Sequence, residues 1–288
     1  MQALLEKENN TYNKISKPDF STKTGREFLA FYLQTKFKQI IAYDKKNESP
    51  IFIDVKNDFI NRFTKRIINN PEKRILVGIC GESASGKTTI CNTIKHSTEK
   101  LNMPVEIISS DNYFNDISEL IRVHGNFDRL LESGYDIDAP TNFQLEQLRD
   151  DLESLSLGTD IRTPQYLING SGVSIPKALE AKSQKIIVVE GMASMFGDVH
   201  ELFDVIVYVD IDRNTQKEWF LQRAKTRNQD HENALKQLDY VRNASEKYIL
   251  PQKPKADIII NGGSALDYFE QIIEYIHKIT NSFLTQEI

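Results

Sequence analysis

A glycine-rich segment that follows an apolar run constrains this chain more than any other feature. Residues 81–88 read Gly-Glu-Ser-Ala-Ser-Gly-Lys-Thr and match the pattern G-x-x-x-x-G-K-[ST]. The apolar run 75–80 precedes the segment, and residues 88–100 after it carry apolar side chains at helical spacing. A strand, such a loop and a helix in this order form a phosphate-binding loop. The segment therefore predicts a buried strand whose end, together with a helix N-terminus, faces a nucleotide.

The side chains of this loop suit a bound triphosphate. Gly81 and Gly86 permit the positive-φ turns that point backbone N–H groups inward, and a helix N-terminus adds about half a unit of positive charge. Lys87 would reach the β- and γ-phosphates, and the Thr88 hydroxyl would bind Mg²⁺. The N/T-K-x-D and D-x-x-G motifs of switch GTPases are missing from the chain, so we expect ATP and Mg²⁺ as cofactors. The predicted nucleotide-binding residues are Gly81, Glu82, Ser83, Ala84, Ser85, Gly86, Lys87, Thr88 and Thr89.

The composition is typical of a soluble globular protein. Of its 288 residues, 40% are hydrophobic and 27% charged. No stretch has the length and apolarity of a signal peptide or a membrane span, so we expect a cytoplasmic protein without a membrane partner. The net charge of −5 offers no broad basic field to a nucleic-acid backbone, and no nucleic-acid partner is expected. Cys80 and Cys91 are expected to be reduced core residues.

Two amphipathic segments precede the phosphate-binding loop. Residues 23–43 and 54–69 place apolar side chains at helical spacing, and Pro71 separates the second segment from the first strand. We predict an N-terminal helical extension over residues 1–70 and a nucleotide-binding domain over residues 71–288. The extension would pack against that domain; a role in regulation or in forming a homo-oligomer is the alternative.

Beyond the loop, short apolar runs alternate with helical patterns. The runs lie at residues 105–108, 186–189, 205–209 and 258–260, and helical spacing marks residues 143–155 and 265–279. This alternation predicts an α/β fold, with a parallel sheet of about five strands covered by helices on both faces. Ligands of such sheets bind beyond the carboxyl ends of the strands. The polar residues that follow each run are therefore candidates for a site.

Two acids and two arginines complete the candidate site. Asp111 follows the second strand and could accept the proton of an attacking substrate hydroxyl. Glu190 ends the next strand and could hold Mg²⁺ directly or through water. Arg223 and Arg227 would share one helix face and form a lid that neutralises charge on a transferred phosphoryl group; a solvated helix face is the alternative. The predicted catalytic residues are Lys87, Asp111, Arg223 and Arg227, and the predicted metal ligands are Thr88 and Glu190.

Five segments carry a resemblance to a known family. Residues 81–89 match G-x-S-x-S-G-K-T-T, residues 109–114 are similar to S-x-D-x-F-Y with the two aromatics exchanged, residues 135–140 to N-F-D-x-P-D-A with one residue fewer, residues 187–191 to V-I-V-x-E-G, and residues 248–260 to F-I-x-P-x-K-x-x-A-D-I-I-I. Over most of residues 74–263 the chain thus resembles the phosphoribulokinase/uridine kinase family of P-loop small-molecule kinases. The resemblance implies a P-loop NTPase fold of the nucleoside monophosphate kinase type, with residues 71–288 as the kinase domain. It also implies ATP-dependent phosphorylation of an alcohol group, with Asp111 as the base and Glu190 near Mg²⁺.

The same resemblance implies a site for the phosphoryl acceptor, a small molecule. The first acid of the third segment, Asp136, would bind substrate hydroxyls, and Tyr113, Phe114 and Tyr166 would border the acceptor. Uridine kinases carry P-x-Y-D followed by a histidine and an arginine that contact the pyrimidine. Here residues 164–167 read Pro-Gln-Tyr-Leu, and neither base-contacting residue follows.

Three functions remain open at this point. The first is a uridine kinase-like enzyme that phosphorylates a nucleoside-like or other small polar metabolite. The second is a pantothenate kinase-like enzyme, since residues 219–223 (Trp-Phe-Leu-Gln-Arg) resemble the W-Y-x-x-R helix of bacterial pantothenate kinases, although their Y-S-H-x-x-Y-D segment is missing. The third is a regulatory nucleotide-binding protein that has lost its acceptor site, as the altered segment 167–173 suggests.

Overall fold

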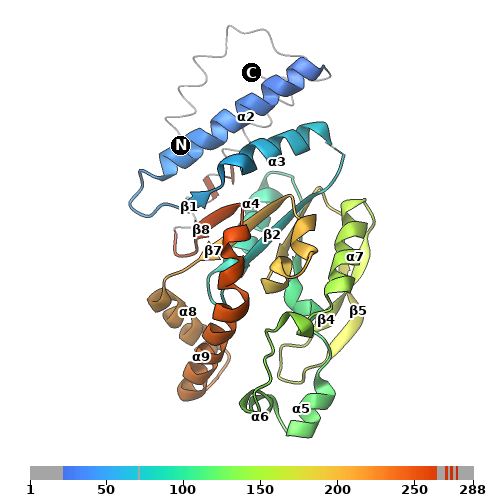
Figure 1. Ribbon diagram of the computed structural model, residues 1–288, viewed down its shortest axis with the longest axis vertical. Helices are drawn as coiled ribbons and strands as arrows, with labels where there is room; N and C mark the ends of the chain where they lie inside the picture. The colour runs from blue at the N-terminus through green and yellow to red at the C-terminus, as the bar shows by residue number, and fades with distance from the viewer. Residues whose placement is uncertain (1–21, 71, 265–269, 272, 275–276, 278–288) are drawn as a thin grey trace.

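A six-stranded sheet forms the centre of the molecule in this computed structural model (Figure 1). The structure describes residues 22–70, 72–264, 270–271, 273–274 and 277. In sheet order the strands are β1 (Phe52–Val55), β8 (Ile258–Asn261), β7 (Val205–Asp210), β2 (Ile75–Gly81), β6 (Ile186–Glu190) and β3 (Val105–Ser109). The five strands from β8 to β3 run parallel, whereas β1 is antiparallel to β8. The prediction of five parallel strands is confirmed, and the segment before the loop adds a sixth strand.

The register of the sheet brings the strand ends of the candidate site together. Ile79 in β2 lies opposite Glu190 in β6, and Glu190 in turn lies opposite Ser109 in β3. The loop that starts at Gly81, the carboxylate of Glu190 and the turn that carries Asp111 therefore emerge at one edge. The strands are almost wholly apolar because both of their faces are covered; Ile187, for example, is fully buried.

Helices cover both faces of the sheet, as predicted. On one face, α4 (Lys87–Lys100) and α2 (Lys23–Asp44) bury Ile90, Cys91 and Tyr32 in one core with Ile79. On the other face, α7 (Leu145–Ser156) packs Leu148 and its neighbours against the sheet, beside the short helices η3 (Met192–Met195) and η4 (Val199–Leu202). Cys80 and Cys91 are both buried and free. The prediction that they are core residues is therefore confirmed.

The N-terminal segment is part of this core. Its second helix, α3 (Asn57–Asn69), packs Phe59 and Ile60 against Val205 of the sheet, and α2 lies along α3 at the top of Figure 1. Strand β1 between the two helices pairs with β8. The domain boundary at residue 70 stays a prediction, and residues 1–21 and most of the predicted helix 265–279 lie outside the described residues.

The remaining elements lie outside the central sheet, and several of them extend below it in Figure 1. They are the hairpin of β4 (Ile161–Tyr166) and β5 (Ser174–Ala181), the helices α5 (Ser118–His124), α6 (Phe127–Glu132), α8 (Arg213–Thr226) and α9 (His231–Tyr248), and the short helices η1 (Ser110–Tyr113), η2 (Pro140–Asn142) and η5 (Leu250–Lys255). The hairpin was not predicted from the sequence. Pro164 interrupts the alternation of β4, and the register shifts at this point between Thr163 and Gln165.

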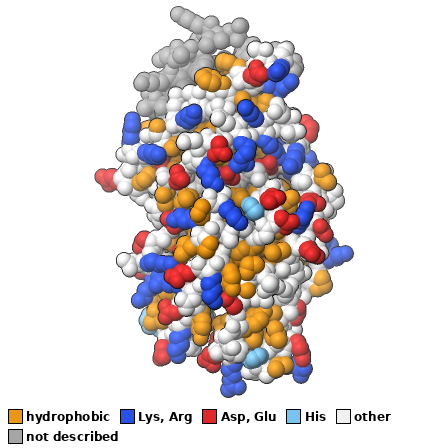
Figure 2. Space-filling view, in the orientation of Figure 1, with side chains coloured by type: hydrophobic (Ala, Val, Ile, Leu, Met, Phe, Trp, Pro, Cys, Tyr) orange, Lys and Arg blue, Asp and Glu red, His pale blue; other side chains and the backbone are white. Residues whose placement is uncertain are grey.

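The outer surface mixes charges of both signs. On the face shown in Figure 2, basic and acidic side chains are interspersed rather than sorted into separate regions. Within the part of the chain that the structure describes, no helix combines the length and the apolarity needed to cross a membrane.

Candidate active site

The phosphate-binding loop has the conformation that the sequence predicts. Gly81 has φ +146°, and a Cβ at this position would lie 2.4 Å from the carbonyl oxygen of Val209, so the backbone leaves no room for a side chain there. Gly86 adopts the left-handed conformation (φ 97°, ψ 7°) and caps α4. The first N–H groups of α4, which have no partner within the helix, consequently face the loop. Together these features form a cradle for phosphate oxygens.

A cavity of about 600 Å³ lies over this loop. Its lining combines loop residues with residues from four strand ends and from α8: Gly81, Ser83, Ala84, Ser85, Gly86, Lys87, Thr88, Thr89, Asp111, Glu190, Gly191, Met192, Trp219, Gln222, Arg223, Arg227, Gly262, Gly263 and Ser264. All the residues predicted to be catalytic or metal-binding therefore lie in one cavity. Of the nine predicted nucleotide-binding residues, Glu82 is not in this lining.

Lys87 and Thr88 hold the positions that a bound Mg²⁺–nucleotide requires. The Lys87 ammonium donates hydrogen bonds to the carbonyl oxygens of Gly81 and Glu82 at 2.9 and 2.8 Å, so it lies over the loop. The Thr88 hydroxyl donates to a carboxylate oxygen of Glu190 at 3.0 Å. A hydroxyl beside a carboxylate is a set of hard oxygen donors that suits Mg²⁺. The structure thus supports Thr88 and Glu190 as a pair.

Asp111 is the acid of the cavity that lies beside Lys87. Burial raises the pKa of its carboxyl group, while the positive charges of Lys87 and Arg223 oppose this shift. Burial likewise lowers the pKa of Lys87, and the charges of Asp111 and Glu190 oppose that change. A carboxylate with a raised pKa is a stronger base, so Asp111 has the environment that proton abstraction needs.

The two predicted lid arginines come from the end of α8. The Arg223 guanidinium donates from Nη2 to the Ser83 hydroxyl of the loop at 2.9 Å and lies over the ring of Phe220, 5.2 Å from its centroid. Arg227 follows at the C-cap of the helix and also lines the cavity. Both arginines thus line the same cavity as Lys87.

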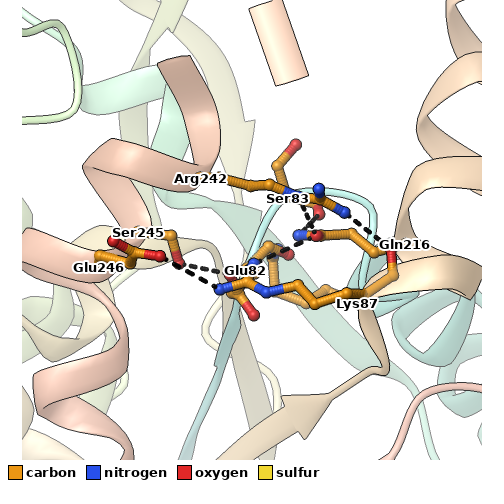
Figure 3. Close-up of polar contacts among 8 residues, drawn as sticks. Glu82, Ser83, Lys87, Gln216, Arg242, Ser245 and Glu246 are labelled. Carbon is orange, nitrogen blue, oxygen red and sulfur yellow. Dashed lines mark hydrogen bonds and ion pairs between the residues drawn. The ribbon is translucent and has the colours of Figure 1, made fainter. Parts of the chain in front are cut away.

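Glu82 is part of the loop, but its side chain turns away from the cavity toward two helices (Figure 3). One carboxylate oxygen accepts hydrogen bonds from Arg213 Nη1 of α8 at 2.7 Å and from the Ser245 hydroxyl of α9 at 2.8 Å. Glu82 is 4% exposed, whereas Arg213 is partly open to solvent. The loop residue predicted to touch nucleotide is therefore an anchor for the helices beside the loop.

A second connection runs parallel to the first. The Gln216 amide of α8 donates to the carbonyl oxygen of Ser83 at 3.1 Å, and its own oxygen accepts from Arg242 Nε of α9 at 3.0 Å. Arg242 also donates to the carbonyl oxygen of Arg213 at 2.7 Å. Gln216 is fully buried. Its hydrogen bonds therefore fix the start of α8 and the end of α9 relative to the phosphate-binding loop.

A second cavity, of about 380 Å³, lies between α9 and the segment that follows α6. Asp136, the predicted binder of substrate hydroxyls, belongs to its lining, but Lys247 and the Tyr248 hydroxyl already donate to its carboxylate at 3.1 and 2.9 Å. Asp138 also lines this cavity. Burial, followed by the negative charges of Asp111 and Asp136, raises the pKa of Asp138 to about 7, and Lys87 opposes this shift.

Asp138 is the acid that the sequence reasoning missed. It lines the second cavity, and the charges of Asp111 and Lys87, which line the first, act on its pKa in opposite directions. The signal was present: Asp138 precedes Pro140 by two residues, which is the spacing of D-x-P in the segment N-F-D-x-P-D-A, whereas Asp136 precedes Pro140 by four. The role predicted for Asp136 therefore stays a prediction, and Asp138 is a second candidate for it.

The aromatic residues predicted to border the acceptor divide into two groups. Tyr113 is fully buried, and its hydroxyl donates to Asp151 at 2.7 Å; the prediction that it contacts the acceptor is wrong, because the ring belongs to the core. Phe114 and Tyr166 are partly exposed and pack on each other with ring centroids 5.2 Å apart. Neither belongs to the lining of the two cavities, and their role in acceptor binding stays a prediction.

The comparisons with known proteins agree with this geometry. The model of the Phosphoribulokinase / Uridine kinase family matches residues 76–268. A uridine kinase of Staphylococcus aureus (strain JH9) is 33% identical over 193 residues, which cover 66% of this chain and 88% of that protein. Uridine kinase-like protein 3 of Arabidopsis thaliana is 28% identical over 209 residues, which cover 70% of this chain but only 42% of that longer protein.

Solved structures show the same fold at lower identity. A phosphoribulokinase from Rhodobacter spheroides superposes with a TM-score of 0.50 at 16% identity, over 66% of this chain and 70% of that one. A candidate fructose transport system kinase from Silicibacter sp. TM1040 superposes with a TM-score of 0.52 at 22% identity, over 65% of this chain and 90% of that one. The sequence matches, the loop and the strand ends around it lead to one conclusion: the chain is a P-loop kinase that belongs to the phosphoribulokinase/uridine kinase family.

Proposed function

We propose that this protein is an ATP-dependent kinase that transfers the γ-phosphate to a hydroxyl of a neutral, hydroxyl-rich small molecule of the nucleoside or sugar class. The observation that carries the proposal is the position of Asp111. It lies in the cavity over the phosphate-binding loop with Lys87 and Glu190, and it is electrostatically coupled to Asp138 at the second cavity. A base between a nucleotide cavity and a second cavity is what direct transfer to an acceptor requires.

The residues of the loop fit ATP with Mg²⁺. The fully buried Ser85 hydroxyl has no protein partner among the described residues and can donate to a phosphate oxygen. The oxygen donors of Thr88 and Glu190 suit a hard cation. When bound, Mg²⁺ would supply charge neutralisation on the phosphate oxygens. Lys87 would hold the terminal phosphates in place.

Asp111 would accept the proton of the acceptor hydroxyl as this oxygen attacks the γ-phosphate. Its raised pKa makes it more basic, and the nearby charge of Lys87 limits the shift. Arg223 and Arg227 would stabilise the charge that develops on the transferred group and would help to exclude water. Glu82 and Gln216 fix the start of α8 to the loop, so the two arginines at its other end would move relative to a fixed helix start.

The charges at the second cavity favour a neutral acceptor. Asp138 and Asp136 contribute carboxylates, and Lys247, the one cation among the residues of that lining, is bound to Asp136 at 3.1 Å. An acceptor that carries a carboxylate or a phosphate would meet this negative charge without a free cation beside it. Hydroxyl groups, in contrast, would donate hydrogen bonds to Asp138.

The test is acceptor-dependent release of ADP from Mg²⁺–ATP. Neutral nucleosides, sugars and polyols would be compared with pantothenate, glycerate and ribulose 5-phosphate. We expect turnover with a neutral acceptor, and a loss of about a hundredfold or more in Asp111→Asn with nucleotide binding retained. Asp150→Asn, which changes an exposed acid on α7, is the matched control. Turnover confined to the anionic acceptors would contradict the proposed acceptor class, and ATP binding without any turnover would favour the regulatory alternative.

A further inference from the structure

The order of the strands gives the nucleotide cavity a direction. Asp111 follows β3 and Glu190 ends β6, and both strands lie on one side of β2 and its loop. Gly262 follows β8, on the other side of β2. Neighbouring strands lie about 4.8 Å apart, so β3 and β8, four positions apart in the sheet, are separated by about 19 Å. The reacting γ-phosphate belongs at the Asp111 side. The nucleobase then belongs at the side of β8.

Trp219 lies at this second side. Its half-buried ring lines the cavity, and a Cβ placed on Gly86 would come within 3.2 Å of the ring atom Cζ3 and within 3.3 Å of the Gly262 carbonyl oxygen. The ring and the segment 262–264 therefore both flank the loop at Gly86. On α8, Trp219 is one turn before Arg223, so the helix face that presents a cation to the loop also presents this ring.

Hydrogen bonds fix the segment 262–264 beside the ring. The Gly262 N–H donates to the Asp210 carbonyl oxygen at 2.8 Å, and the Ser264 hydroxyl donates to the carbonyl oxygen of Pro50 at 3.1 Å. The N–H of Asn261 donates to the carbonyl oxygen of Ile51 at 2.8 Å. The N-terminal extension thus supports one wall of the space that Trp219 borders.

We propose that Trp219 is the stacking surface for the nucleobase of the phosphoryl donor, with the segment 262–264 beside it. The inference rests on the proposed function in that it requires ATP in the loop, but it requires no particular acceptor. A flat, half-buried aromatic ring beside backbone groups suits a purine, whose π-face can stack and whose edge can form hydrogen bonds. Stacking by itself does not distinguish adenine from guanine.

The chain contains a single tryptophan, so tryptophan emission, excited at a wavelength that tyrosine does not absorb, reports on this site alone. Titration with Mg²⁺–ATP should change the emission, and titration with Mg²⁺–tripolyphosphate, which has no base, should leave it nearly unchanged. By calorimetry, Trp219→Ala should raise the Kd of ATP by about tenfold or more and leave that of tripolyphosphate unchanged. Trp219→Phe, which keeps a ring, should restore most of the affinity, and Phe31→Ala, which removes an exposed ring on α2, is the control.

Each outcome separates this inference from the proposed function. An unchanged Kd for ATP in Trp219→Ala, or an equal loss for ATP and tripolyphosphate, overturns the stacking role, while turnover by the wild-type protein would still support the kinase. Fluorescence and affinity that depend on the base, without turnover on any acceptor, would support the stacking role and contradict the proposed kinase activity. A wild-type protein that binds no ATP overturns both.

Discussion

Gly262 and Gly263 are adjacent glycines with opposite tolerance for a side chain. A Cβ on Gly262 would lie 1.9 Å from the Ser85 carbonyl oxygen and 2.9 Å from a methyl group of Val209, whereas a Cβ on Gly263 would meet only Asn261, at 3.4 Å. Because ordinary contacts begin at about 3.4 Å, Gly262→Ala must displace the phosphate-binding loop or the segment 262–264 by about 1.5 Å. Gly263→Ala should displace neither.

The displacement falls within the nucleotide cavity, since Ser85 and Gly262 both line it. A shift of about 1 Å in a catalytic site can cost about a hundredfold in rate, and overpacking costs about 1–3 kcal/mol of stability. We expect Gly262→Ala to raise the Kd of ATP by at least about tenfold, to lower turnover by about a hundredfold and to lower the free energy of unfolding in that range.

The measurements are calorimetry with Mg²⁺–ATP, ADP release with the best acceptor and urea unfolding, each on both variants. Gly263→Ala should lower affinity and rate much less than Gly262→Ala, because its Cβ meets only Asn261, at 3.4 Å. Equal behaviour of the two variants would refute the reasoning, since it would mean that the close approach of Gly262 to Ser85 does not position the loop.

Two further substitutions test the acids and the core. Burial and neighbouring acids raise the pKa of Asp138 to about 7 from 3.8, so between these pH values the folded protein binds more protons than the unfolded chain and its free energy of unfolding should fall as pH rises. Urea unfolding at pH 5 and pH 8 should show a smaller fall of this free energy in Asp138→Asn than in the wild type. Equal falls in the two proteins would contradict the raised pKa. Tyr113→Phe removes the hydrogen bond to Asp151. It should lower the free energy of unfolding by about 1–3 kcal/mol and leave the KM for the acceptor unchanged. A raised KM without a loss of stability would show instead that Tyr113 contacts the acceptor.

The sequence predicts the elements whose patterns are local. Each parallel strand is a short apolar run, and the positions of Asp111 and Glu190 follow from the rule that parallel strands end at one edge. Strand β1 is different, because it is a four-residue edge strand in which Asp54 interrupts the apolar residues. A pattern that short does not distinguish a strand from a turn.

The contacts that complete the site could not be predicted, because they join distant parts of the chain. Glu82 meets Arg213 and Ser245 across 131 and 163 residues, and no spacing in the sequence relates these positions. The choice between Asp136 and Asp138 depends in the same way on α9, whose Lys247 occupies the first acid. Residue types near a motif therefore predict the chemistry, but tertiary packing decides which side chains are free to perform it.

The pairing of β1 with β8 has a consequence for the order of assembly during folding. Phe52 pairs with Ile260, so the last strand of the sheet meets a strand synthesised near the beginning of the chain. Contacts this remote in sequence form slowly, and until they form, β8 leaves one edge of the sheet open. We expect the phosphate-binding half of the cavity to mature first and the wall at residues 262–264 to close last. Competence to bind the whole nucleotide would then mark the completion of the fold.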